Sequence, residues 1–379
     1  MHNPLRIAAL RERMRQSDLS ALYIRSLSNI AWLSGFERVF DTESAHALIL
    51  TQDACVLHSD SRYVEALRDR AQGTEIEIDA SRVAHAALLC DTIASLSPTE
   101  TAGSCAVGIE DSLTLSEFRA LEKACAERDL ASHVTLVELN GFVEQLREVK
   151  DPSEIEAMKK AQRITDAAFL RICDFMAVGM TERQVQLQLD QYLFEEGAEG
   201  LAFDTIVATG AHAASPHAIP GETLLEKGDA VVMDFGARYA GYCSDMTRTV
   251  FMGQPSDELI HAWDALRETN ESCEALLHEG VSAASVHDHA EEMLSCAGYA
   301  GRMGHSLGHS VGLDIHESPN LSPSNAEPVR AGNVVTVEPG IYVPGKFGMR
   351  LEDFGVITED GYDVFTKSTH KMVIIKRQL

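Results

Sequence analysis

Two acidic residues interrupt apolar, strand-like segments in the second half of the chain. Asp234 lies in AVVMDFG (230–236), and Asp245 follows in GYCSDMTRTV (241–250). Because successive side chains of a strand point to opposite faces, an antiparallel hairpin can bring both carboxylates to one face. Unpaired charges in an apolar sheet are costly, so they need a cation, an arginine partner or a shared proton. A metal ion would satisfy both carboxylates at once.

The same arrangement recurs near the C-terminal end. Glu338 lies in NVVTVEPGIYV (333–343), and Glu352 lies in MRLEDFGVI (349–357). Each pair places one acidic residue on either strand of an expected hairpin, and helical patterns precede both pairs. The repetition predicts an internal duplication of a helix-plus-hairpin unit.

Histidines lie between the two acidic pairs, in HSLGHSVGLDIHE (305–317). His305 and His309 flank a glycine, and His316 ends an apolar run. Four carboxylates with one imidazole suit divalent Mn, Co, Fe or Zn, of which we prefer Mn or Co, and thiolate-selected copper is excluded. Two such ions ~3.5–4 Å apart can share a bridging hydroxide as nucleophile and polarise a carbonyl. The donor set therefore predicts hydrolysis.

Length and local patterns predict two domains. A chain of 379 residues exceeds the size at which single cores usually stop growing. Short strands and helices alternate over residues 1–145, which predicts an α/β domain. A long helix begins at Lys150-Asp-Pro-Ser-Glu154, where Asp151 can cap, Pro152 suits the first turn and Glu154 completes a capping box. We expect residues 146–379 to form an α+β catalytic domain.

Composition limits the partners. The 32 Lys and Arg residues against 58 Asp and Glu give a net charge of −26, which argues against nucleic acid or an anionic membrane as a partner. No segment approaches the ~20 apolar residues of a membrane span, and no apolar leader is visible. The eight cysteines are scattered without a CxxC pair, which indicates reduced thiols. We therefore expect a cytoplasmic protein.

Taken together, four motifs resemble the creatinase/aminopeptidase P/prolidase family, whose catalytic fold is called "pita-bread". They are PHAIPGETLLEKGDAVVMDFG, GYCSDMTRT, GHSLGHSVGLDIHE and TVEPGIYVPGKFGMRLED, within residues 150–370. SNIAWLSGF (28–36) and SDSRY (59–63) are similar to the smaller α/β domain of that family. The resemblance implies a metal-dependent peptidase that hydrolyses the Xaa-Pro bond at the N-terminus of short proline-containing peptides, with two divalent ions per subunit and a homodimeric assembly.

The resemblance also implies roles for individual residues. The implied metal ligands are Asp234, Asp245, His309, Glu338 and Glu352. His217, in SPHAIP, matches a substrate-side histidine, and His305 and His316 match histidines on the leaving-group side.

In the implied reaction, Glu338 transfers a proton from the attacking hydroxide. His217 and His316 stabilise the tetrahedral oxyanion or protonate the leaving nitrogen. Arg350 lies two residues before Glu352, and it would orient a ligand carboxylate or hold the carboxylate terminus of the substrate.

Other interpretations stay open at the level of sequence. The enzyme could be a prolidase that cleaves dipeptides only, a methionine aminopeptidase, or a creatinase-like C–N hydrolase without metal. A non-catalytic binding protein on the same fold is an alternative of another class.

Asp245 by itself could pair with Arg248. Cys243 is expected to be a buried apolar thiol, and Asp353 should point to the face opposite Glu352.

Overall fold

The computed structural model describes residues 4–41, 43, 45–96 and 105–379, which fall into two units, Met1–Arg147 and Glu148–Leu379. Each unit has its own sheets and its own hydrophobic core. Within the described ranges, no helix is both long and apolar enough to span a membrane.

The first unit is built on one mixed sheet with the strand order β4-β3-β2-β1-β5-β6. Its strands are β1 (Ala21–Ile24), β2 (Ala47–Thr51), β3 (Cys55–His58), β4 (Glu77–Asp79), β5 (Cys105–Glu110) and β6 (Val134–Leu139). Its helices are α1 (Pro4–Gln16), α2 (Leu27–Ser34), α3 (Val64–Ala71), α4 (His85–Ser95), α6 (Leu115–Glu127) and α7 (Glu144–Arg147). β1 is parallel to β5 and antiparallel to β2. The expected α/β architecture is confirmed.

The core of the first unit follows from strand alternation. Ala21 and Tyr23 of β1 pack with Leu89 of α4 and Leu121 of α6 on one face of the sheet. All four residues of β1 are buried, because both faces of this central strand are covered.

The second unit contains the same motif twice. In each half, two helices precede a pair of antiparallel strands, and a smaller hairpin is inserted between the paired strands. The first half has α8 (Pro152–Phe175), α9 (Glu182–Glu195), β9 (Ala230–Phe235) and β12 (Met246–Met252), with the insert β10 (Ala237–Tyr239) and β11 (Tyr242–Cys243). The second half has α10 (Asp257–Leu276), α11 (Ala283–Cys296), β15 (Val334–Val337) and β18 (Asp353–Ile357), with the insert β16 (Gly340–Val343) and β17 (Phe347–Arg350). The expected duplication is confirmed.

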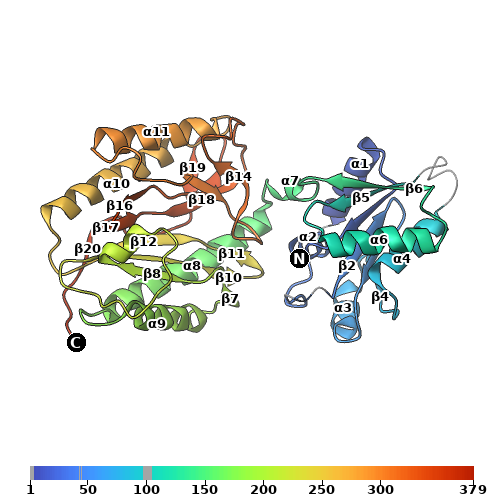
Figure 1. The fold of residues 1–379 in the computed structure, drawn as a ribbon, viewed down its shortest axis with the longest axis horizontal. Coiled ribbons are helices and arrows are strands. Elements are labelled where there is room, and N and C mark those ends of the chain that lie inside the picture. The colour runs from blue at the N-terminus through green and yellow to red at the C-terminus, as the bar shows by residue number, and fades with distance from the viewer. Residues whose placement is uncertain (1–3, 42, 44, 97–104) are drawn as a thin grey trace. The chain divides into compact units, whose positions relative to one another are not determined.

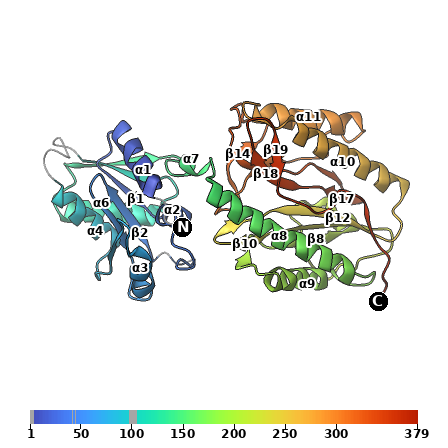
Figure 2. The same ribbon diagram turned by 180° about the vertical axis from the view of Figure 1, so that it is seen from behind.

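The two helix pairs cover opposite sides of the strands. Figures 1 and 2 show α10 and α11 on one side of the second unit and α8 and α9 on the other. Helix α8 begins with the expected capping box, in which Asp151 accepts from the backbone of Ser153 and Glu154 while Glu154 reaches back to Asp151. The strands, with the site described below, therefore lie between two helical layers.

Shorter strands complete the sheets of the second unit. β8 (Ile206–Thr209) and β20 (Val373–Ile375) flank the β9–β12 pair, and β7 (Gly200–Leu201) pairs with β10. β13 (Gly308–Ser310), β14 (Glu317–Leu321) and β19 (Tyr362–Val364) extend the β15–β18 pair.

The structure corrects the expected positions of three acidic residues. Only Asp234 lies inside a strand, β9. Asp245 directly precedes β12, Glu338 directly follows β15, and Glu352 directly precedes β18. The sequence pattern placed all four within strands, but the inserted hairpins turn the chain away at these positions. Each of the three residues therefore lies just outside its strand, at the end of the strand pair where the small hairpin is inserted.

Candidate metal centre

The strand register brings the acidic residues together. Thr247 of β12 is opposite Asp234 of β9, and Asp245 lies two residues before Thr247 and so on the same face. In the second half, Val337 is opposite Asp353. The same register extended by one residue puts Glu338 opposite Glu352.

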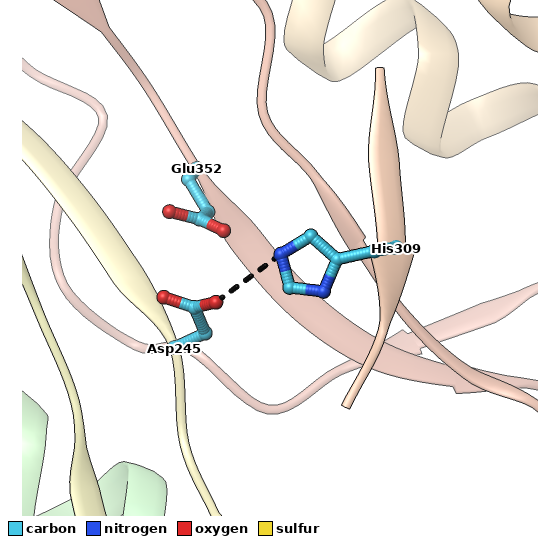
Figure 3. A group of neighbouring side chains, drawn as sticks. All are labelled: Asp245, His309 and Glu352. Carbon is cyan, nitrogen blue, oxygen red and sulfur yellow. Dashed lines mark ion pairs between the residues drawn. The ribbon is translucent and has the colours of Figure 1, made fainter. Parts of the chain in front are cut away.

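His309 of β13 completes a compact group of ligand atoms. Its Nε2 lies 3.5 Å from Asp245 Oδ2 and 3.5 Å from Glu338 Oε1. Asp245, His309 and Glu352 each offer one ligand atom, and these atoms lie within 4.8 Å of one another. Figure 3 shows the three side chains converging from separate segments of the chain. Such a group has the size and composition of a site for a divalent cation.

Two glycines allow the backbone to approach closely at this point. A Cβ on Gly236, after Asp234, would lie 2.0 Å from the carbonyl oxygen of Ser244. A Cβ on Gly308, before His309, would lie 2.0 Å from the carbonyl oxygen of Thr336. No side chain fits at such distances, so the glycines of the DFG and GHS segments serve close packing of the backbone around the site.

Two of the carboxylates, those of Asp234 and Glu352, each have one oriented and one unpartnered oxygen. Asp234 Oδ2 accepts from Arg350, and Glu352 Oε2 accepts from Thr247 Oγ1 at 2.6 Å. Asp234 Oδ1 and Glu352 Oε1 are buried and lack a hydrogen-bond partner in the described part of the chain. Leaving such atoms unpaired is unfavourable. The donor set thus fits cations that would bind the unpartnered oxygens.

Electrostatics within the group favour a positive charge. Burial first, and then the neighbouring carboxylates, raise the pKa of Asp245 and of Glu352 well above their usual values. Burial also raises the pKa of Glu338 and lowers the pKa of His309. Divalent cations would offset this repulsion and keep the carboxylates ionised and the imidazole neutral, which are the forms that bind metal.

Arg350 supports the ligand set from behind. It is 4% exposed, and its three nitrogens donate to Thr247 Oγ1 at 2.8 Å, to Tyr342 Oη at 2.8 Å and to Asp234 Oδ2. Its Nε also lies 3.9 Å from Glu338 Oε2. These contacts orient the carboxylate of Asp234, and both expected roles of Arg350 stay predictions.

The remaining predicted histidines line one cavity of about 790 Å³, together with the five predicted ligands and Arg350. His217 is exposed in the loop after the short 3₁₀ helix Gly210–Ala214. His305 lies 3.1 Å from Tyr342 Oη, and the rings of His309 and His316 meet edge to face at 4.5 Å. Burial lowers the pKa of both His305 and His316. The structure thus brings all the predicted site residues to a single cavity.

Arg248 does not pair with Asp245. Its Nη2 donates to Asp353 Oδ1 at 2.6 Å, and both side chains are 1% exposed. Asp353 Oδ2 lies 2.6 Å from His370 Nε2. Arg248 Nη1 also donates to the carbonyl oxygen of Glu352 at 2.5 Å. Asp353 therefore points away from Glu352, as expected, and belongs to a buried ion network behind the site.

Three supporting residues were missed from the sequence. Thr247 bonds both Glu352 and Arg350, and Thr336 Oγ1 donates to Glu338 Oε1 at 3.3 Å and accepts from the backbone of His309 at 3.0 Å. Each threonine lies two residues from an acidic residue, so strand alternation could have indicated them. Tyr342 offered no such local signal.

The duplicated fold and this donor set define the class of metal-dependent hydrolases. Comparison of the sequence agrees with that class. Residues 156–359 match the model of metallopeptidase family M24, and residues 6–149 match the creatinase/prolidase N-terminal domain. The chain belongs to metallopeptidase family M24. Its family implies divalent metal ions, and the pita-bread catalytic fold expected from the sequence is confirmed.

Full-length relatives share both units. The uncharacterized peptidase YqhT of Bacillus subtilis is 34% identical over 372 residues, which cover 98% of this chain and 100% of that protein. The structure is similar to an Xaa-Pro dipeptidase from Bacillus anthracis, with a TM-score of 0.88, 32% identity and coverage of 98% and 100% of the two chains. It is also similar to an X-Pro aminopeptidase from Thermotoga maritima, with a TM-score of 0.83, 32% identity and coverage of 96% and 100%.

Proposed function

We propose that this metallopeptidase hydrolyses the Xaa-Pro bond at the N-terminus of short peptides, using two divalent ions, Mn or Co. The proposed ligands are Asp234, Asp245, His309, Glu338 and Glu352. The observation that carries the proposal is the pair of buried, unpartnered oxygens, Asp234 Oδ1 and Glu352 Oε1, in a carboxylate group that lines a large cavity. Neither a metal-free hydrolase nor a binding protein would require these oxygens to be left unpaired.

Divalent ions held by these residues would supply Lewis acidity toward the scissile carbonyl and would lower the pKa of the attacking water. The protein groups around them perform the remaining work. Glu338 Oε1 lies 3.5 Å from His309 Nε2 at the wall of the cavity, so its carboxylate, ionised in the metal-bound state, can accept a proton and pass it on.

The histidines of the cavity act on the substrate. We assign to His217 and His316 the stabilisation of the oxyanion and the protonation of the leaving nitrogen, because both are exposed to the cavity. His305 is held by Tyr342 and by the carbonyl oxygen of Ser306 at 2.7 Å, which fixes its ring at the wall of the cavity. A fixed ring at this wall can position the leaving peptide.

Specificity for proline is supported by the two solved structures described above, one an Xaa-Pro dipeptidase and the other an X-Pro aminopeptidase, at equal identity. The cavity of about 790 Å³ lies within the ~300–1,000 Å³ range of small-molecule sites. We favour cleavage of short Xaa-Pro peptides in general, with a dipeptide-only prolidase as the alternative. Cytoplasmic location and a homodimer stay predictions of the sequence.

The test compares hydrolysis of Ala-Pro, Ala-Pro-Ala and Met-Ala-Ala by protein stripped of metal and then restored with Mn or Co. Asp245→Asn should lose both bound metal and activity, whereas Asp264→Asn, an exposed aspartate on α10, should retain both. Cleavage of Ala-Pro-Ala supports the aminopeptidase, and cleavage of Ala-Pro alone supports the prolidase. Cleavage of Met-Ala-Ala only would contradict the proline assignment, and metal-independent cleavage would contradict the metal mechanism.

A further inference from the structure

Among the described residues that line the catalytic cavity, two carry a permanent positive charge, Arg350 and Arg183. All three nitrogens of Arg350 already donate to Thr247, Tyr342 and Asp234. Three of the five N–H groups of Arg350 are therefore engaged, and the residue is only 4% exposed. Arg183 is the more accessible of the two cations for a negatively charged part of a substrate.

Arg183 lies near the start of α9, and the residue is exposed. Nη1 donates to Gln186 Oε1 at 2.9 Å, which is a neutral partner one helical turn away. No ion pair within 4.0 Å involves Arg183 in the described part of the chain. The side chain thus keeps donors for a ligand while Gln186 restrains its direction.

The backbone fixes Arg183 beside the catalytic loop. Its amide donates to the carbonyl oxygen of Gly221 at 3.0 Å. The buried carboxylate of Glu182 accepts from the amide of Gly221 at 3.1 Å. Gly221 belongs to the loop that carries His217, and Ile219 and Pro220 of this loop also line the cavity. Helix α9 and this loop therefore form one connected wall.

We propose that Arg183 binds the free C-terminal carboxylate of the substrate peptide and so gives the enzyme a preference for short peptides that end within the cavity. A guanidinium binds a carboxylate through two parallel N–H donors, and this wall offers no competing permanent cation in the described residues. The inference rests on the proposed peptidase function, because it names the substrate class of that same site.

Acidic groups around Arg183 oppose its attraction for an anion and supply an internal control. Asp204 is exposed and lines the same cavity. Asp190 is partly buried; burial and Asp204 raise its pKa, while Arg183 counteracts that rise. Removing the charge of Asp204 should therefore strengthen the preference for a peptide carboxylate, opposite in sign to the loss of Arg183.

The experiment measures kcat/KM for Ala-Pro, Ala-Pro-Ala and Ala-Pro-Ala-Ala, each as the free acid and as the C-terminal amide. For the wild type, we expect the acid to be preferred over the amide by about tenfold for at least one peptide length. This is the lower end of the range for a charge-assisted hydrogen bond, because Arg183 is an exposed residue. Arg183→Gln should bring this ratio close to one, Arg183→Lys should keep part of it, and Asp204→Asn should raise it.

An acid-to-amide ratio that Arg183→Gln leaves unchanged at every length would overturn the inference. Calorimetric binding of Ala-Pro-Ala and its amide to the metal-loaded wild type and to Arg183→Gln gives a readout that does not depend on cleavage. If no proline peptide is cleaved but the acid still binds more tightly than the amide in an Arg183-dependent way, the proposed function fails and the inference stands. If peptides are cleaved and neither readout depends on Arg183, the inference fails alone.

Discussion

Thr247 Oγ1 donates a hydrogen bond of 2.6 Å to Glu352 Oε2, and this bond joins the two halves of the duplicated catalytic unit. The same hydroxyl accepts from Arg350 Nε at 2.8 Å. Thr247 thus fixes one carboxylate oxygen of Glu352 and leaves the other, Oε1, unpartnered toward the site. A partner that orients a metal-binding carboxylate usually contributes to metal affinity.

The first prediction concerns this hydroxyl. Thr247→Val should weaken metal binding by about 10- to 100-fold, because Glu352 loses the donor that orients it. Metal affinity is measured by competition with a fluorescent chelator. Thr249→Val is the matched control, since Thr249 is also buried on β12 but bonds the backbone of Arg350 and not a carboxylate. Equal losses of affinity in both variants would contradict the assigned role.

The second prediction concerns metal and stability. Without metal, Glu352→Gln should unfold at a higher denaturant concentration than the wild type, because the substitution removes a buried carboxylate whose pKa is raised well above its usual value by burial and by neighbouring carboxylates. With metal in excess, the order should reverse, since a ligand at about 1,000 times its Kd stabilises by roughly 4 kcal/mol. Urea titrations with and without Mn test this reversal. The same order under both conditions would argue against Glu352 as a ligand.

The third prediction concerns the ion pair behind the site. Asp353→Asn should destabilise the catalytic unit by about 3–5 kcal/mol, because it leaves the buried guanidinium of Arg248 without its charged partner. Fluorescence of Trp263, which is buried in this unit, reports urea unfolding in a Trp32→Phe background. Glu258→Gln breaks the exposed pair with Lys346 and should cost less than about 1 kcal/mol. Comparable losses in the two variants would contradict the importance of burial.

The fourth prediction concerns pH. Burial, and then the charge of Asp353, raise the pKa of Glu274 from 4.5 to about 8. An acid whose pKa is raised on folding favours the folded state while it is protonated, so its contribution is lost as the pH rises from 4.5 to about 8. Because of Glu274, the free energy of unfolding of the wild type should therefore fall by on the order of a few kcal/mol across this window. Glu274→Gln should remove this fall. Glu268→Gln, at an exposed position on the same helix, should leave the decline in place.

Much of the fold was predictable because its signals are local. The capping box at Asp151 and Glu154 marked the start of α8, and apolar runs marked β1, β9 and β15. The spacing of acidic residues indicated the two hairpins and their duplication. The pattern failed at the strand ends, because the small hairpins inserted after β9 and after β15 take Asp245, Glu338 and Glu352 out of the strands. Such departures depend on packing between segments and not on the local period of side chains.

The sequence by itself determined which residue types can gather at the site and that they come from two pairs of strands, because the alternating pattern of a strand is a property of the local backbone. Only the tertiary structure decided how charges are partnered. In the structure, Arg248 pairs with Asp353, which lies 105 residues away, and Arg350 pairs with Asp234, which lies 116 residues away. The physical reason is that two buried charges pair only where the register of separate hairpins brings them within a few ångströms. The sequence of a single segment does not determine this distance.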